Sequence, residues 1–175
     1  MTEITIREFT PQDRDWVVAQ HAEHYAAAEG FDATFGALVG QIVDGFVSGH
    51  DPVAERGWIA QRGEMRLGSI FCVRLDRDTA KLRLFLLVPQ AREQGLGGRL
   101  LTTCMGFARD AGYGGMQLWT HESHAAACAL YQARGWQRIS SKPVHSFGQD
   151  LVEQSWVYRF LGGQGCRPVE GPGEL

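Results

Sequence analysis

Residues 80–98, AKLRLFLLVPQAREQGLGG, decide the fold class of this 175-residue chain. The stretch begins with apolar residues up to Val88 at a spacing typical of a strand. Pro89 ends the strand because its ring leaves no backbone donor, and a polar, glycine-rich loop follows at 92–98. From Leu96 onward the apolar residues recur at helical spacing. The sequence therefore predicts a buried strand, a tight loop and a helix in direct succession.

The predicted strand becomes apolar on both faces in its second half. One face is expected to carry, in alternation, Ala80, Leu82, Leu84, Leu86 and Val88. The other face changes from Lys81 and Arg83 to Phe85 and Leu87. We expect the second half to be buried on both faces, deep in the sheet.

The glycine-rich loop has the features of an anion site. Unpaired backbone N–H groups and the positive end of the helix dipole converge where such a loop meets a helix, and glycine lets an anion approach the amides. A P-loop would require GxxxxGK followed by Ser or Thr, and no lysine stands near this loop. A dinucleotide fingerprint, GxGxxG, would place glycine or alanine where Leu100 stands. The loop therefore fits neither of these classes of nucleotide-binding site.

Short strands and helices are predicted on both sides of this unit. Apolar periodicity indicates an N-terminal strand, helices over 11–30 and 33–48, and strands over 58–60, 67–75 and 80–88. After a helix over 96–111 come a strand over 116–120, a helix from Ser123 as N-cap to Arg134, and a last strand over 151–160. The predicted fold class is α/β (α+β), a mixed sheet with helices on both faces.

Charge and composition exclude several classes of protein. A net charge of −3 gives no basic field, so we expect no nucleic-acid partner. The four cysteines stand far apart and are expected to be reduced thiols in a cytoplasmic protein. The N-terminus alternates polar and apolar residues, unlike a signal peptide, and no segment offers the roughly 20 apolar residues that span a bilayer. We expect no membrane association.

The length and the composition of the C-terminus define the expected domain boundaries. A hydrophobic content of 44% suffices for one core, and we expect a single domain over 1–161. Residues 162–175 are rich in Gly, Pro and Glu and are expected to form a disordered tail.

Two motifs resemble those of the GNAT acetyltransferase superfamily. Arg92, Gly95 and Gly97 fill the pattern Arg/Gln-x-x-Gly-x-Gly/Ala, directly after the apolar strand. Downstream, residues 129–136, ALYQARGW, resemble the Leu-Tyr-x-x-x-Gly-Phe segment, with Trp136 in the aromatic position. The resemblance implies the GNAT fold, whose central mixed sheet is mostly antiparallel.

A closer resemblance lies in three further segments. Residues 80–84, 117–120 and 146–151 resemble the acetyltransferase half of bacterial proteins that fuse a MarR-type DNA-binding domain to a GNAT domain. This chain has no such DNA-binding half and would be a stand-alone version.

The resemblance implies acetyl-CoA as a cosubstrate, held by the end of the apolar strand and by the loop. That strand end should splay from its neighbour and offer backbone groups to the pantetheine arm. His124 stands where many members have an Asn that holds this arm. The expected cofactor-binding residues are Leu86, Leu87, Val88, Arg92, Glu93, Gln94, Gly95, Leu96, Gly97, Gly98, Arg99, His124 and Tyr131.

Acetyl transfer to an amine requires a proton donor for the thiolate and a proton acceptor for the amine. By resemblance Tyr131 is the general acid, since a phenol with a pKa of about 10 is protonated at neutral pH. Its helical face is apolar, and a core role is the alternative. For the general base, Glu122 and His121 come first because they follow the strand beside the expected thioester. The other candidates are Glu64, His21, His24 and Tyr25.

These residues lead to a predicted reaction and an alternative. The predicted function is transfer of an acetyl group to a primary amine of a small-molecule or amino-acid-like acceptor, by direct attack on the thioester. The alternative is a non-catalytic acyl-CoA-binding sensor or regulatory module. No metal is expected, because residues 121–124, HESH, are not HExxH. The last strand, as an exposed edge, is a candidate homodimer interface.

Overall fold

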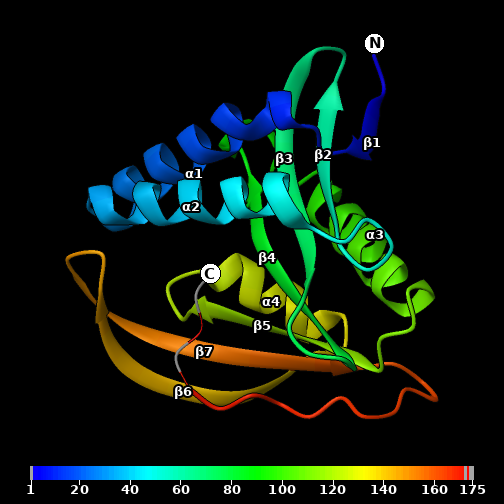
Figure 1. Ribbon diagram of the computed structural model, residues 1–175. Helices are drawn as coiled ribbons and strands as arrows, with labels where there is room; N and C mark the ends of the chain where they lie inside the picture. The colour runs from blue at the N-terminus through cyan, green and yellow to red at the C-terminus, as the bar shows by residue number, and fades with distance from the viewer. Residues whose placement is uncertain (1, 172, 174–175) are drawn as a thin grey trace.

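The computed structural model describes residues 2–171 and 173 of the chain (Figure 1). Its helices are η1 (Pro11–Asp13), α1 (Arg14–Glu29), α2 (Ala33–Gly49), η2 (Pro89–Ala91), α3 (Leu96–Asp110) and α4 (Ala125–Ala133), where η marks a 3₁₀ turn. Its strands are β1 (Ile4–Glu8), β2 (Arg56–Arg62), β3 (Met65–Arg74), β4 (Thr79–Leu87), β5 (Gly115–His121), β6 (Gln137–Ser146) and β7 (Gln149–Arg159).

The strands form one mixed sheet in the order β1-β2-β3-β4-β5-β7-β6. Only the pair β4 and β5 is parallel among these neighbours, and the remaining pairs are antiparallel. Helices α1 and α2 cover one face with a core around Val17, Phe35 and Val43, whereas α3 and α4 cover the other around Leu100 and Leu118. The predicted fold class, with helices on both faces, is confirmed.

Strand β4 contains a bulge that changes which face its side chains point to. Its pairing with β3 shifts between Ser69 and Phe71, and Leu84 has a φ of 52°. Before the bulge, Leu82 packs under α3 and α4; Leu84 packs under α1 and α2, and Phe85 returns to the first side. The prediction that the five alternating apolar residues share one face was therefore wrong, because a bulge reverses the alternation.

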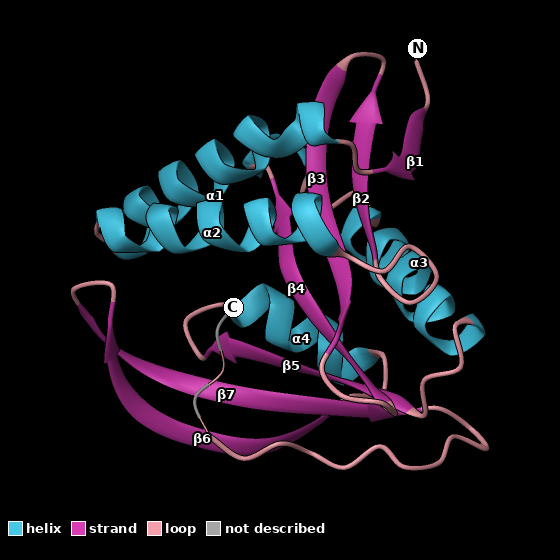
Figure 2. Cartoon of the chain, viewed as in Figure 1, coloured by secondary structure: helices cyan, strands magenta, loops and turns pink. Residues whose placement is uncertain are grey.

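The bulge lies where β4 separates from β5. These two strands pair only from Thr79 to Lys81 on β4, and beyond Lys81 they diverge (Figure 2). The structure thus contains the splay expected at the strand end. Because of it the second half of β4 borders an opening, and Phe85 and Leu87 are only half-buried there rather than enclosed in the sheet.

The C-terminal edge of the sheet differs from the prediction. Strand β6 had no predicted bounds, since its side chains are mostly exposed and Pro143 interrupts the pattern. It pairs with β7 along its length, and β7 lies between β5 and β6. The last strand is therefore not the exposed edge that the homodimer hypothesis assumed.

The described part of the C-terminal tail, which we predict to be disordered, lies beside the sheet. It has no helix or strand, but it runs along β5, where Gln117 exchanges two hydrogen bonds with the backbone of Val169 at 2.9 and 3.1 Å. Trp119 Nε1 also donates to the carbonyl of Gly171 at 3.3 Å. Hydrogen bonds from two side chains of β5 thus hold the tail against the sheet, although the tail itself has few apolar residues.

No helix in the described chain is both long and apolar enough to cross a membrane.

Candidate active site

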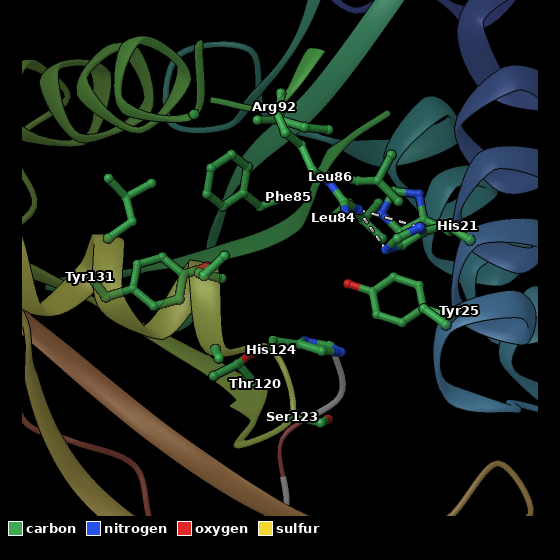
Figure 3. A pocket seen from close by; sticks show the side chains of 18 of the residues that line it. His21, Tyr25, Leu84, Phe85, Leu86, Arg92, Thr120, Ser123, His124 and Tyr131 are labelled. Atoms are coloured by element: carbon green, nitrogen blue, oxygen red, sulfur yellow. Dashed lines mark hydrogen bonds between the residues drawn. The ribbon is translucent and has the colours of Figure 1, made fainter. Parts of the chain in front are cut away.

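A cavity of about 700 Å³ opens at the splay between β4 and β5. Four parts of the chain form most of its lining, to which Phe35 of α2 is added: the second half of β4, the loop leading into α3, one face of α1, and the segment from the end of β5 into α4 (Figure 3). Its volume is typical of a small-molecule or cofactor site. The divergence of two strands of the same sheet therefore creates the candidate site.

The loop before α3 forms one end of this cavity. Gly95, the N-cap of α3, adopts the left-handed conformation with a φ of 73°, which glycine reaches without strain. As a glycine it has no side chain to cap the helix, so the first amide N–H groups of α3 lack an intrahelical partner. Gly97 and Gly98 line the cavity beside them. This helix start is suited to bind an anion such as a phosphate group.

Most of the predicted cofactor-binding residues line the cavity together. These are Leu86, Leu87, Arg92, Glu93, Gly95, Leu96, Gly97, Gly98, His124 and Tyr131. Three others lie elsewhere. Val88 is buried in the core, Gln94 donates to the carbonyl of Gln90, and Arg99 donates to the carbonyl of Ile4.

Arg92 connects the loop with α1. Its Nη2 atom lies 2.9 Å from Nε2 of His24, so the guanidinium reaches across the cavity mouth. The pKa of His24 is lowered, first by burial and then by the charge of Arg92, which keeps this imidazole neutral and able to accept.

Arg134 is a basic residue at the loop that is not among the predicted cofactor-binding residues. It follows α4, and its guanidinium lies so close to Gly98 that a Cβ atom there would collide with it. It donates to Thr102 Oγ1 at 2.5 Å and lines a second, shallower depression with Arg99. The signal was present in the motif, since Arg134 stands directly before Gly135.

Tyr131 lies on α4 at the centre of the cavity wall. It is 4% exposed, and its ring packs between Phe85 and Trp136, with centroid distances of 6.3 and 5.7 Å. Its hydroxyl end faces the cavity, opposite that of Tyr25 on α1 (Figure 3). Burial raises the pKa of Tyr131, so the phenol remains protonated throughout the neutral range.

The two preferred general-base candidates do not join Tyr131. His121 is 3% exposed and packs against Phe31 and His124 behind the cavity wall, where burial lowers its pKa to about 4. Glu122 is exposed, and its backbone N–H donates to Val152. Neither belongs to the described lining of the cavity, and Glu64 lies in the exposed turn between β2 and β3.

Helix α1 presents a row of polar side chains to the cavity. His21, Tyr25 and Glu29 are spaced four residues apart, so they share one helical face, and His24 lies beside them. The 4-residue spacing was visible in the sequence, but the direction of this face was not.

The segment between β5 and α4 differs from its predicted form. The helix begins at Ala125 with His124 as N-cap, not with Ser123. The hydroxyl of Ser123 instead donates to Oε2 of Glu29 at 2.8 Å, and Nδ1 of His124 lies 3.1 Å from the hydroxyl of Thr120. These contacts connect α1 with α4 across the open end of the sheet.

A profile of the Acetyltransferase (GNAT) family matches residues 7–136, well over half of the chain. The chain therefore belongs to the GNAT family of acetyltransferases.

The curated relatives are named as N-acetyltransferases. N-acetyltransferase 8B of Homo sapiens is 29% identical over 117 residues, which cover 63% of this chain and 52% of that protein. N-acetyltransferase 8 of Homo sapiens is 34% identical over 94 residues, which cover 49% of this chain and 41% of that protein. The chain thus spans about half the length of these relatives.

Solved structures share the fold at low sequence identity. A GNAT-family acetyltransferase from Streptococcus pneumoniae has a TM-score of 0.71 and 18% identity, covering 90% of this chain and 100% of that one. An acetyltransferase from Salmonella typhimurium, solved with its cofactor acetyl-CoA, has a TM-score of 0.72 and 15% identity, covering 96% of this chain and 99% of that one. At such identities the likeness shows the fold.

Proposed function

We propose that this protein is an N-acetyltransferase that moves the acetyl group of acetyl-CoA to a primary amine of a small-molecule or amino-acid-like acceptor. The observation that carries the proposal is one cavity that joins a helix start suited to anions, a buried phenol and a polar face of α1. Membership of the GNAT family supports acetyl-CoA as the donor.

The residues at the loop fit a coenzyme with phosphate groups. The uncapped amides at the start of α3 and the guanidinium groups of Arg92 and Arg134 would hold the pyrophosphate, and the splayed end of β4 would hold the pantetheine arm. When bound, acetyl-CoA supplies a thioester whose carbonyl carbon forms the new C–N bond as the C–S bond breaks. Among the described residues no cluster of His, Cys, Asp or Glu is arranged to hold a metal ion.

In this proposal Tyr131 protonates the departing thiolate. Its raised pKa is no obstacle, because burial disfavours the charged form of the thiol as well as that of the phenol. The acceptor arrives as an ammonium ion and must lose one proton before attack, and a second proton leaves the nitrogen as the amide forms. One of these two protons restores the phenol of Tyr131, and the other is released to solvent.

The wall opposite β4 supports a small acceptor. Phe147, in the turn between β6 and β7, packs against Phe31 and Phe35 with centroid distances of 5.0 Å, and its carbonyl accepts from Asp32 N–H at 3.0 Å. This turn is thus fixed against the start of α2, and we infer that it restricts the approach of a polypeptide chain to the cavity from that side. We further propose, on the three segments named in the sequence analysis, that the chain is a cytoplasmic, bacterial relative of the acetyltransferase half of the MarR-GNAT fusion proteins.

Coenzyme binding is expected to raise the melting temperature by roughly 5 to 10 °C. A ligand at about 100 times its Kd stabilises the folded state by about 2.7 kcal/mol, and each kcal/mol is worth about 2 to 4 °C at this size. Thermal unfolding should be measured with acetyl-CoA, CoA, NAD and NADP in separate samples. A higher melting temperature with the two CoA ligands alone supports the proposal. A higher melting temperature with a nicotinamide nucleotide, or no change with any ligand, would refute it. Binding without thiol release on any amine would favour the sensor alternative.

Replacing Arg134 with Gln should weaken CoA binding about tenfold. The change removes one charge beside the helix start, and a hydrogen bond to a charged group contributes about 1.5 kcal/mol or more. Isothermal titration with CoA measures the change. Arg109→Gln is the matched control, because Arg109 lies at the exposed far end of α3. Equal affinities of both variants would exclude a phosphate contact by Arg134.

A further inference from the structure

The carboxylate of Glu29 is a cavity feature that neither the loop nor Tyr131 explains. Glu29 is the last residue of α1, and it lines the cavity with a side chain that is 11% exposed. Oε2 accepts from the hydroxyl of Ser123 at 2.8 Å, which fixes the direction of the carboxylate. The side chain is thus held at the cavity wall rather than extended into solvent.

This carboxylate has no cationic side chain beside it. Among the described residues, no Lys or Arg lies within ion-pair distance of Glu29. The side chain that does lie within this distance is that of His124, whose Nε2 is 3.3 Å from Oε1 of Glu29 but does not form a hydrogen bond with it. Removing a carboxylate from water without a cation is unfavourable. A cationic ligand would compensate for this cost.

The position of Glu29 at the end of α1 adds to the negative potential. The C-terminal end of a helix carries partial negative charge and favours a cation, not an acid. The last turn of α1 contains no basic residue, so nothing within the helix balances Glu29. The helix end and the carboxylate therefore act together on the same side of the cavity.

The imidazoles around Glu29 do not provide the missing positive charge. The pKa of His124 is lowered to about 4, chiefly by burial, and the pKa of His24 is lowered for the same first reason. Both are neutral at pH 7. Arg92, the basic residue of the loop, is directed to His24.

Much of the remaining cavity lining is apolar. Phe35, Leu84 and Trp119 line the cavity, together with the ring of Tyr25, and the lining also includes the cationic side chain of Arg83. His21 offers one further acceptor: its Nδ1 lies 2.7 Å from the carbonyl of Val17 and so carries the proton, which leaves the buried Nε2 with a free lone pair. Apolar side chains beside the Glu29 carboxylate and a neutral nitrogen acceptor suit an apolar molecule that bears an ammonium group.

We propose that Glu29 forms the ammonium-binding subsite of the acceptor, and that the acceptor is a primary amine on an apolar body with no carboxylate next to the amine. The inference rests on the proposed acetyltransferase function and narrows its acceptor class. An α-carboxylate, as in an amino acid, would lie close to Glu29 and to the negative end of α1, where like charges repel.

Binding of three matched probes to the CoA-saturated protein tests this subsite. The probes are 2-phenylethylamine, phenylalanine, which adds a carboxylate, and 2-phenylethanol, which replaces the ammonium with a hydroxyl. By isothermal titration, 2-phenylethylamine should bind at least tenfold more tightly than either of the others. In Glu29→Gln, whose amide oxygen still accepts from Ser123, the affinity for 2-phenylethylamine should fall at least tenfold while that for 2-phenylethanol stays unchanged.

The control variant is Glu23→Gln, on the exposed side of the same helix, which should bind all three probes like the wild type. If the wild-type protein binds phenylalanine or 2-phenylethanol as tightly as it binds 2-phenylethylamine, the inference is overturned. This outcome does not depend on whether the Glu29→Gln variant folds. An unchanged affinity of Glu29→Gln for the amine would also overturn it. Failure of CoA itself to bind would instead refute the proposed function, so the two failures are distinguishable.

Discussion

Tyr131→Phe should lower kcat by about 10²- to 10⁴-fold, the range that positioned proton transfer contributes to catalysis. The substitution removes only the hydroxyl, whose end faces the cavity, and keeps the ring that packs against Phe85 and Trp136. Without that proton donor the thiolate must leave unprotonated in a poorly hydrated site. Thiol release from acetyl-CoA, measured at saturating acceptor, reports kcat directly. The Kd of CoA should remain within about twofold, because a phenol-to-phenyl change leaves the loop intact.

Tyr113→Phe is the matched control for this prediction. Tyr113 is also buried, and its hydroxyl donates to the carbonyl of Ala54 at 2.8 Å, far from the cavity lining. Its loss should cost about 1 kcal/mol of stability and leave kcat unchanged. Full activity of Tyr131→Phe on every acceptor would show that Tyr131 is a core residue. A similar loss in both variants would attribute the effect to stability.

The parts of the site that the sequence predicted are those fixed by local geometry. The order of strand, proline, glycine-rich loop and helix in residues 80–111 determines where the amides point, because adjacent residues set the helix start. The motif of residues 129–136 likewise predicted that Tyr131 lies at the site, and Tyr131 lines the cavity. Such features depend on a few neighbouring residues and require no knowledge of how distant strands pair.

Features that depend on distant pairing were not predictable in this way. The bulge at Leu84 follows from the register of β4 against β3, and the two-residue alternation alone gives no sign of it. Strand β6 is stabilised by its pairing with β7 and not by a buried face, so it lacks the apolar pattern of a strand.

The positions of the two general-base candidates also depend on distant pairing. Glu122 and His121 were preferred because they follow β5, but their proximity along the chain to the expected thioester does not fix the direction of their side chains. The pairing of β5 with β7 leaves His121 buried behind the cavity wall and Glu122 in solvent. Glu29 reaches the cavity from a helix almost 100 residues earlier, through its contact with Ser123.

Acidification from pH 7.5 to 4.5 should destabilise the protein by several kcal/mol, largely through buried imidazoles. Burial lowers the pKa values of His21, His121 and His124 to about 4 each, whereas an unfolded His titrates near 6.5. Between these values the unfolded chain binds more protons than the folded one, so the free energy of unfolding falls as the pH falls. Above pH 6.5 these rings are neutral in both states and contribute no pH dependence.

His21→Gln isolates one of these contributions. For the fully enclosed ring of His21 the difference between 6.5 and about 4 corresponds to about 3 kcal/mol, and a glutamine amide can still donate to the carbonyl of Val17. Urea unfolding at several pH values should show that the variant loses up to about 3 kcal/mol less than the wild type between pH 7.5 and 4.5. Burial raises the pKa of Glu153 and gives it the opposite pH dependence, which cancels in this difference.

Two further groups define the limits of this prediction. The carboxylate of Asp13 loses solvation on burial, but hydrogen bonds from Arg7, Thr10 and Arg66 outweigh that loss and lower its pKa. Its contribution to the free energy of unfolding is therefore lost only below about pH 4.

His145, exposed and paired with Asp150 at 2.8 Å, provides the control, and His145→Gln should keep the pH dependence of the wild type. If His21→Gln and His145→Gln unfold with the same pH dependence as the wild type, proton uptake by the buried ring does not drive the acid transition. The destabilisation would then have to come from the other buried imidazoles, His121 and His124, which His121→Gln would test next; Glu153 is no candidate, because its raised pKa stabilises the folded state as the pH falls.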